Sequence, residues 1–182
     1  MKVLVTGAAG QLGTELVEAF QRGGHEVVGT THATLDISQP DQVQECVASL
    51  KPQFIVHAAA WTAVDACESD KEKAFAVNGT ATASLVSAAE KVGARVAYVS
   101  TDYVFDGSKT SPYVETDAVN PQSVYGASKL AGEQALRPVD LIVRISWVCG
   151  FHGGNMVKTI LRIAAAQPEL TFVHDQIGNP TF

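Results

Sequence analysis

Short apolar runs alternate along the chain with longer segments whose apolar residues recur at helical spacing. Apolar runs of this length predict strands, and the helical spacing predicts amphipathic helices. We expect strands at 2–6, 26–30, 54–59, 95–100, 140–145 and 170–173, and helices at 14–22, 38–50, 70–92 with a break near 78–79, 123–136 and 155–166. The strands are apolar throughout, as in parallel strands covered on both faces. The pattern predicts an α/β fold with a doubly wound, mostly parallel sheet, in one unit over 1–182.

Composition and charge narrow the function classes. The chain has 182 residues, of which 46% are hydrophobic, so a disordered chain is excluded. A net charge of −6 without a Lys/Arg cluster argues against binding to nucleic acid or an anionic membrane. No apolar run approaches the ~20 residues of a membrane helix, and the N-terminus lacks the apolar core of a signal peptide.

The cysteines and histidines give no sign of a metal or a disulfide framework. Cys46, Cys67 and Cys149 are odd in number and widely spaced, and the five histidines show no recognisable ligand spacing. We therefore predict a reduced, cytoplasmic protein without a metal site.

A glycine pattern follows the first strand directly and opens a helix. Gly7 permits a tight turn, Gly10 lets the backbone approach a pyrophosphate, and Gly13 lets the helix pack close to the strand. The helix N-terminus would then direct free N–H groups at the phosphates. An ordinary tight turn between strand and helix is the alternative, but the strand–loop–helix context favours dinucleotide binding.

The end of the second strand bears on the choice between NAD and NADP. Thr30, Thr31 and His32 stand where an acid would accept a hydrogen bond from the ribose 2′-hydroxyl. No carboxylate is present to repel a 2′-phosphate, and no Arg or Lys is present to neutralise it. The sequence favours NADP(H), with NAD(H) as the alternative; these residues could also be plain solvated loop residues.

Tyr125 and Lys129 form the candidate acid–base pair. They are four residues apart and share one face of a helix. A nearby ammonium would favour the phenolate and let the tyrosine exchange a proton near neutral pH. Ser100, Thr101 and Asp102 end the fourth strand and bring a hydroxyl to the same edge of the sheet. The alternative is a surface Tyr and Lys on one helix stripe.

Longer motifs extend this picture to a family. The combination of GxxGxxG, Ser/Thr and YxxxK resembles the extended short-chain dehydrogenase/reductase family, whose members bind NAD(P) on a Rossmann-like fold. More narrowly, the chain resembles the dTDP-4-dehydrorhamnose reductase family of that group. The motifs that carry this resemblance are 56–65, 100–107, 120–133, 144–148 and 175–181.

The resemblance implies an oxidoreductase of dTDP-rhamnose biosynthesis, in which a reduced nicotinamide passes a hydride to the C4 ketone of dTDP-4-dehydro-L-rhamnose. Tyr125 would donate the proton, Lys129 would lower the pKa of the tyrosine and hold the ribose, and Thr101 would orient the ketone. The implied cofactor-binding residues are Gly7, Gly10, Gln11, Leu12, Gly13, Thr30, Asp36, Ile37, Ala60, Trp61, Thr62, Val99, Tyr125 and Lys129, and the implied substrate-binding residues are Thr101, Asp102 and Trp147.

Several alternatives remain open at this point. Asp36 could start the turn before Ser38, Trp147 could be a core tryptophan, and Trp61 stands where family members often carry a smaller or polar residue. The family resemblance also admits a nucleotide-sugar epimerase or dehydratase, or a non-catalytic dinucleotide-binding regulatory subunit. The sequence leaves the exact sugar and the oligomeric state open, with a homodimer as one option.

Relatives in this family continue well beyond the motif at 175–181, which Phe182 follows directly. We therefore expect the C-terminal part of the substrate-binding region to be absent, apolar surface to be exposed in its place, and turnover by the 182-residue chain to be weak or absent.

Overall fold

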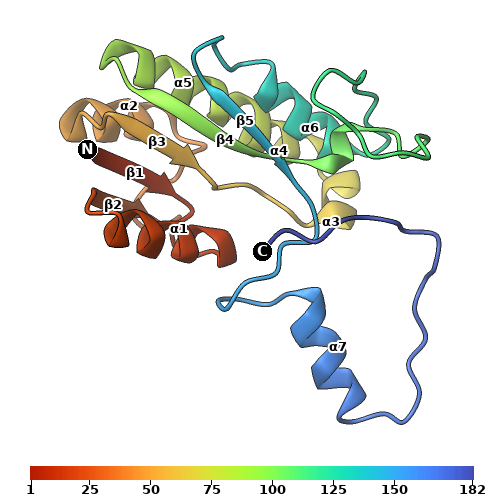
Figure 1. Ribbon diagram of the computed structural model, residues 1–182. Coiled ribbons are helices and arrows are strands. Elements are labelled where there is room, and N and C mark those ends of the chain that lie inside the picture. The colour runs from red at the N-terminus through yellow and green to blue at the C-terminus, as the bar shows by residue number, and fades with distance from the viewer.

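A computed structural model describes residues 1–182. Its centre is a single parallel sheet of five strands in the order β2-β1-β3-β4-β5 (Figure 1). The strands are β1 (Lys2–Thr6), β2 (Glu26–Thr30), β3 (Phe54–His57), β4 (Arg95–Thr101) and β5 (Leu141–Ile145). The order reverses between β1 and β3, and ligands bind at such a point, beyond the carboxyl ends of the strands.

The helices cover the two faces of the sheet unequally. Helix α1 lies on one face, beneath β1 and β2, and α2, α5 and α6 lie on the other (Figure 1). The helical elements are α1 (Gln11–Arg22), α2 (Pro40–Leu50), α3 (Val64–Ser69), α4 (Lys71–Phe75), the π-helical η1 (Ala76–Thr80), α5 (Ala81–Lys91), the 3₁₀ turn η2 (Asp102–Val104), α6 (Val124–Glu133) and α7 (Met156–Ala164). This arrangement confirms the predicted doubly wound α/β fold.

The core has a larger and a smaller part, one on each side of the sheet. The larger cluster joins α2 and α5 to the sheet through side chains such as Leu4, Val47 and Leu85, all fully buried. On the other side, Val3, Val5 and Val56 pack with the apolar face of α1. Burial of such side chains contributes roughly 1.5–3 kcal/mol each, so the β1–β3 centre is firmly anchored.

Strand β5 departs from the expected burial. Leu141 is 48% exposed and Val143 is 45% exposed. Both pair in register with β4 residues whose side chains face α1, namely Ala97 and Val99. Helix α1 packs against β1, β2 and Phe54 of β3, and these β5 side chains remain exposed. The prediction that the strands are covered on both faces is therefore wrong for β5.

One further expectation needs correction. Residues 170–173 form no strand, since the segment finds no partner strand and its side chains Phe172 and Val173 are exposed. Outside the five strands, the chain forms only an isolated β-bridge, between Val148 and Thr181. The break expected near 78–79 is the π-helical segment η1, and α3 was not anticipated.

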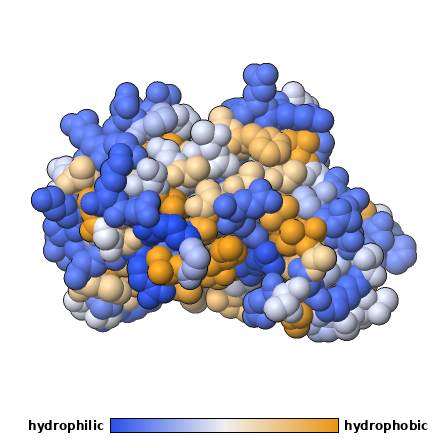
Figure 2. All heavy atoms as spheres, turned by 90° about the horizontal axis from the view of Figure 1, so that it is seen from above, coloured by the Kyte–Doolittle hydropathy of each residue, from blue (hydrophilic) through white to orange (hydrophobic).

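Seen from the side of α2, α5 and α6, the surface is largely polar at its margin, with apolar patches between (Figure 2). No helix has the length and apolar character needed to cross a bilayer.

Candidate active site

Helix α6 begins at a capped turn that places Tyr125 at the inner face. Ser123 is the N-cap, and its hydroxyl accepts a hydrogen bond from the Gly126 N–H at 3.1 Å. Tyr125 is only 8% exposed and packs with Cys67 and Ala74. The phenol therefore lies inside the protein, beside the carboxyl end of β4, and not in bulk water.

Thr101 lies beside the Tyr125 phenol at this edge and acts to lower the pKa of Tyr125. Thr101 is 5% exposed; its hydroxyl donates to Asp102 Oδ1 at 3.2 Å and accepts from the Tyr103 N–H at 3.2 Å. Burial raises the pKa of Asp102. The structure thus brings the predicted tyrosine and the predicted hydroxyl together.

Lys129 reaches β4 rather than the phenol. Its Nζ donates to the Val99 carbonyl oxygen at 2.7 Å and lies 4.1 Å from the centroid of the Tyr98 ring. Burial lowers the pKa of Lys129 to about 7, against an opposing effect of Glu133. The ammonium is therefore close to its titration midpoint at neutral pH.

The expected acidification of Tyr125 is not found in this state. Burial raises the pKa of Tyr125 to about 12, although the neighbouring Thr101 acts in the opposite direction, and Lys129 is not among the groups that shift it. Desolvation disfavours the phenolate more strongly than the surrounding polar groups favour it. Tyr125 is consequently a protonated group that can act as a donor.

The glycine turn has the close contacts expected of it. Gly7 has φ +72°, a backbone angle that residues with a side chain rarely adopt. A Cβ there would lie 2.8 Å from the Ala59 nitrogen. A Cβ on Gly13 would lie 2.1 Å from the Gly7 carbonyl oxygen. Helix α1 then starts at Gln11, with Gly10 as its N-cap residue and no side-chain cap, which leaves its first N–H groups available to an anion.

An open cleft of about 260 Å³ lies over this turn. Its walls come from the loops after β1, β2 and β3 and from η1, and they include Gly7, Gly10, Thr31, Ile37, Ala60 and Val77. Since this is where a parallel sheet binds a dinucleotide, the residues present fit such a cofactor.

The residues expected near the adenine differ in what they do. Ile37 is buried and lines the cleft. Asp36 Oδ1 accepts from the Ser38 N–H at 3.0 Å and the Ser38 hydroxyl at 2.7 Å, and these bonds lower the pKa of Asp36. Asp36 therefore starts the turn before Ser38, which was the alternative to its contact with the adenine. Thr30 is buried, and its hydroxyl has no hydrogen-bond partner.

Other predicted site residues lie around the edge of the sheet. The backbone N–H of Trp61 donates to Asn78 Oδ1 at 2.9 Å. Thr62, the next residue, is exposed. Gln11 donates to the Val148 carbonyl at 2.8 Å, so it anchors the segment after β5, and Leu12 is half-buried next to it.

Trp147 is not a core residue. It is 37% exposed, has φ +47°, and its indole packs against the backbone at Gly178. The core alternative for Trp147 is therefore wrong, and its place on the rim leaves a substrate contact open.

A buried chain of polar groups behind the site was missed from the sequence. His57 Nδ1 lies 2.7 Å from the Thr6 hydroxyl and Nε2 lies 3.2 Å from the Thr82 hydroxyl. Asn78 continues this chain, since its Nδ2 donates to the Ser128 hydroxyl at 3.0 Å. Asn78 lies in the π-helical η1, and π-helical turns occur frequently at functional sites; the expected break near 78–79 was the sequence signal for it.

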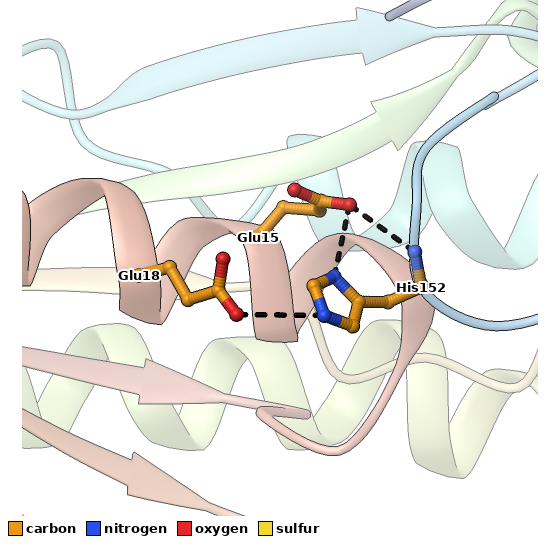
Figure 3. A group of neighbouring side chains, drawn as sticks. All are labelled: Glu15, Glu18 and His152. Atoms are coloured by element: carbon orange, nitrogen blue, oxygen red, sulfur yellow. Dashed lines mark hydrogen bonds and ion pairs between the residues drawn. The ribbon is translucent and has the colours of Figure 1, made fainter.

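A second group, Glu15, Glu18 and His152, joins α1 to the loop before α7 (Figure 3). Glu15 Oε1 accepts from His152 Nδ1 at 3.0 Å and from the Phe151 N–H at 2.8 Å, and His152 Nε2 lies 3.4 Å from Glu18 Oε1. Their ligand atoms lie within 4.8 Å of one another, a proximity that the separations along the chain did not reveal. In this structure the histidine joins the two carboxylates.

Comparison with known proteins shows extensive similarity. The chain is 45% identical to dTDP-4-dehydrorhamnose reductase of Burkholderia thailandensis and 41% identical to spore coat polysaccharide biosynthesis protein SpsK of Bacillus subtilis, over its whole length. A crystal structure of a dTDP-4-dehydrorhamnose reductase from Clostridium acetobutylicum superposes on all of the chain with a TM-score of 0.95 at 43% identity. One from Bacillus anthracis, in complex with NADP, superposes on 99% of it with the same score at 40% identity.

The chain spans 62% and 65% of the two curated relatives and 65% of each crystal structure. The family model described as the RmlD substrate binding domain matches residues 1–182. With the parallel sheet, the glycine turn and the buried tyrosine in place, this match shows that the chain belongs to the RmlD substrate binding domain family.

Proposed function

We propose that the protein catalyses reduction of the C4 ketone of dTDP-4-dehydro-L-rhamnose to dTDP-L-rhamnose, using NADPH. The observation that carries this proposal is the buried contact between Tyr125 and Thr101 at the carboxyl end of β4, with Lys129 one helical turn further along α6. Similarity to proteins named dTDP-4-dehydrorhamnose reductase supports the choice of substrate.

Each residue of this group has a distinct role in the proposed reaction. The nicotinamide, when bound, supplies the hydride that reduces the ketone carbon. Tyr125, which its raised pKa keeps protonated, donates its proton to the oxygen that becomes the hydroxyl. Thr101 orients that oxygen by a hydrogen bond. Lys129, whose Nζ donates to the Val99 carbonyl in this structure, would bind the nicotinamide ribose.

The cleft over the glycine turn would hold the dinucleotide. Gly10 and the start of α1 bind the pyrophosphate, and Ile37 forms an apolar wall for the adenine. NADPH is favoured because no carboxylate ends β2, whose last residue is Thr30; the structure with NADP in the Bacillus anthracis relative supports this choice. NADH is the alternative, since relatives at 25% identity carry NAD.

The remaining residue assignments belong to the same proposal. Asp102 and Trp147 contact the nucleotide sugar, and residues 1–182 comprise the dinucleotide-binding domain with the start of the substrate-binding part. Gln11, Leu12, Thr30, Asp36, Ala60, Trp61, Thr62 and Val99 complete the proposed cofactor site. A cytoplasmic location and a homodimer stay predictions.

A spectrophotometric assay tests the function. Enzymatically prepared keto-sugar is added to the chain with NADPH or NADH, and the loss of absorbance at 340 nm is followed beside sugar product. We expect one cofactor oxidised per sugar reduced, and Tyr125→Phe to lower the rate by about 10²–10⁴-fold. Equal, measurable rates for the two proteins would refute the assigned acid.

Cofactor stoichiometry separates the neighbouring activities. An epimerase or dehydratase of the same superfamily would convert sugar without net oxidation of NADPH. A regulatory subunit would bind NADPH and convert no sugar. Either result, obtained with correctly folded protein, would replace the proposed reduction.

A further inference from the structure

Helix α6 carries a buried stripe of three polar side chains, Tyr125, Lys129 and Glu133, spaced by four residues. This spacing places them on one face of the helix. They meet successive residues of β4: Lys129 Nζ donates to the Val99 carbonyl at 2.7 Å, and Glu133 Oε1 accepts from the Ser100 hydroxyl at 2.5 Å. The contact of Tyr125 with the next strand residue completes the series.

Glu133 also makes a bidentate ion pair with β5. Arg144 Nε donates to Oε1 at 2.9 Å, and Arg144 Nη2 donates to Oε2 at 2.6 Å. The Glu133 side chain is 4% exposed and that of Arg144 is 23% exposed. A bidentate carboxylate–guanidinium pair of this kind is a strong, charge-assisted contact, and it lies at the end of the stripe.

We propose that Glu133 is a positioning residue for the active site: through Ser100 and Arg144 it fixes α6 on the carboxyl ends of β4 and β5, and its carboxylate places a negative charge on the helix face that carries the buried Lys129. The contacts of Glu133 are independent of the proposed reduction, and only their benefit to catalysis rests on it.

Among the groups around Lys129, Glu133 is the one that opposes the effect of burial on the pKa of Lys129. The titratable and charged groups that face this region from the packed elements are His57 of β3, Tyr98 of β4, Asp102 of η2, Tyr125 and Glu133 of α6, and Arg144 of β5. Burial lowers the pKa of His57 to about 3, so that ring is neutral near pH 7, and burial raises the pKa of both tyrosines. Glu133 is the group that raises the pKa of Lys129 against the effect of burial.

The test is Glu133→Gln, which keeps the size of the side chain and removes its charge. The Lys129 ammonium is titrated by NMR in the full chain with ¹³Cε-labelled lysine, and its signal is assigned with Lys129→Arg. We expect the titration midpoint of Lys129 to fall by about one pH unit. Looser packing alone would admit water and raise the midpoint toward that of a free lysine. A rise or an unchanged midpoint would overturn the proposal.

Asp140→Asn is the matched control, because Asp140 is a buried carboxylate that pairs with Arg137 through Nη2–Oδ1 at 2.8 Å, before β5 begins. It should lower stability without moving the Lys129 midpoint. If it moves the midpoint as far as Glu133→Gln does, a general loss of stability explains the effect and the proposal fails.

A double variant covers the case in which Glu133→Gln does not fold. Glu133→Met with Arg144→Met removes both charges and leaves neither unpaired, a change that is often neutral for stability. The midpoint should still fall, since Glu133, and not Arg144, is among the groups that shift the pKa of Lys129. An unchanged midpoint would overturn the proposal here too. The titration needs no cofactor, so absence of NADPH binding would reject the proposed function alone.

Discussion

His57 shows how a single buried side chain can set the response of the protein to acid. Burial is the main reason that the pKa of His57 falls from 6.5 to about 3, and the Lys129 charge adds to the effect. Between these values the unfolded chain binds a proton that the folded protein does not. Stability from this group is therefore complete above about pH 6.5 and is lost as the pH falls toward 3.

We predict that His57→Gln removes this part of the pH dependence. Glutamine can still hydrogen-bond Thr6 and Thr82 but cannot be protonated. Urea unfolding between pH 4 and 7.5 should show wild type losing its advantage over the variant as the pH falls. The exposed His32→Gln serves as control, and a His57→Gln difference that stays constant with pH would contradict the prediction.

At the same scale, spacing identified the candidate acid–base pair but not the protonation of its members. Tyr125 and Lys129 lie one helical turn apart on α6, as their separation predicts. Whether Lys129 acidifies Tyr125 depended on where its long side chain goes, and it goes to the Val99 carbonyl. The burial that raises the pKa of Tyr125 comes from packing with Cys67 and Ala74, distant segments of sequence.

Among the elements, α6 depends on close approach to its neighbours. A Cβ on Gly132 would lie 2.3 Å from the Tyr98 hydroxyl and 2.5 Å from the Asn78 carbonyl oxygen. In an exposed helix, alanine in place of glycine would stabilise by about 1 kcal/mol. Here we predict that Gly132→Ala destabilises by about 1–3 kcal/mol, because α6 must move away from β4.

Denaturant unfolding measures this change, with Gly154→Ala as control because nothing lies within 4 Å of its added Cβ. Equal or greater stability of Gly132→Ala would show that α6 can shift freely. The displacement should also weaken NADPH binding, since Lys129 lies on the same helix; intact affinity at reduced stability would limit the effect to packing.

Elements whose apolar pattern is strong and local were the ones predicted correctly. The runs at β1 and β2 and the helical spacing of α1 needed no tertiary information. The expected strand at 170–173 has a suitable apolar composition, but a strand also needs a partner, and none lies beside Phe172 and Val173. Six-residue α3 has too few turns for a periodic pattern to be visible.

For the molecule as a whole, the buried residues are concentrated in the sheet and its covering helices, and α7 has none. The sheet centre at β1 is fully buried, whereas α7 has no buried residue and lies apart from the sheet (Figure 1). Leu161 of α7 is 66% exposed and Ile177 beyond it is 97% exposed. This agrees with the expectation of exposed apolar surface, which no single-residue pattern could locate because it depends on which faces have a covering element.

Hydrogen exchange should reveal this difference directly. An isolated helix of the nine residues of α7 is marginal in water, and opening it exposes almost no buried surface. We predict that α7 amides exchange at least about 100-fold faster than those of β1 at neutral pH. His152→Ala, which breaks the link to Glu15 and Glu18 (Figure 3), should speed exchange in the 150–154 loop and leave β1 unchanged. Protection of α7 equal to that of β1 would mean that another part of the molecule, or a second copy, covers this helix in solution.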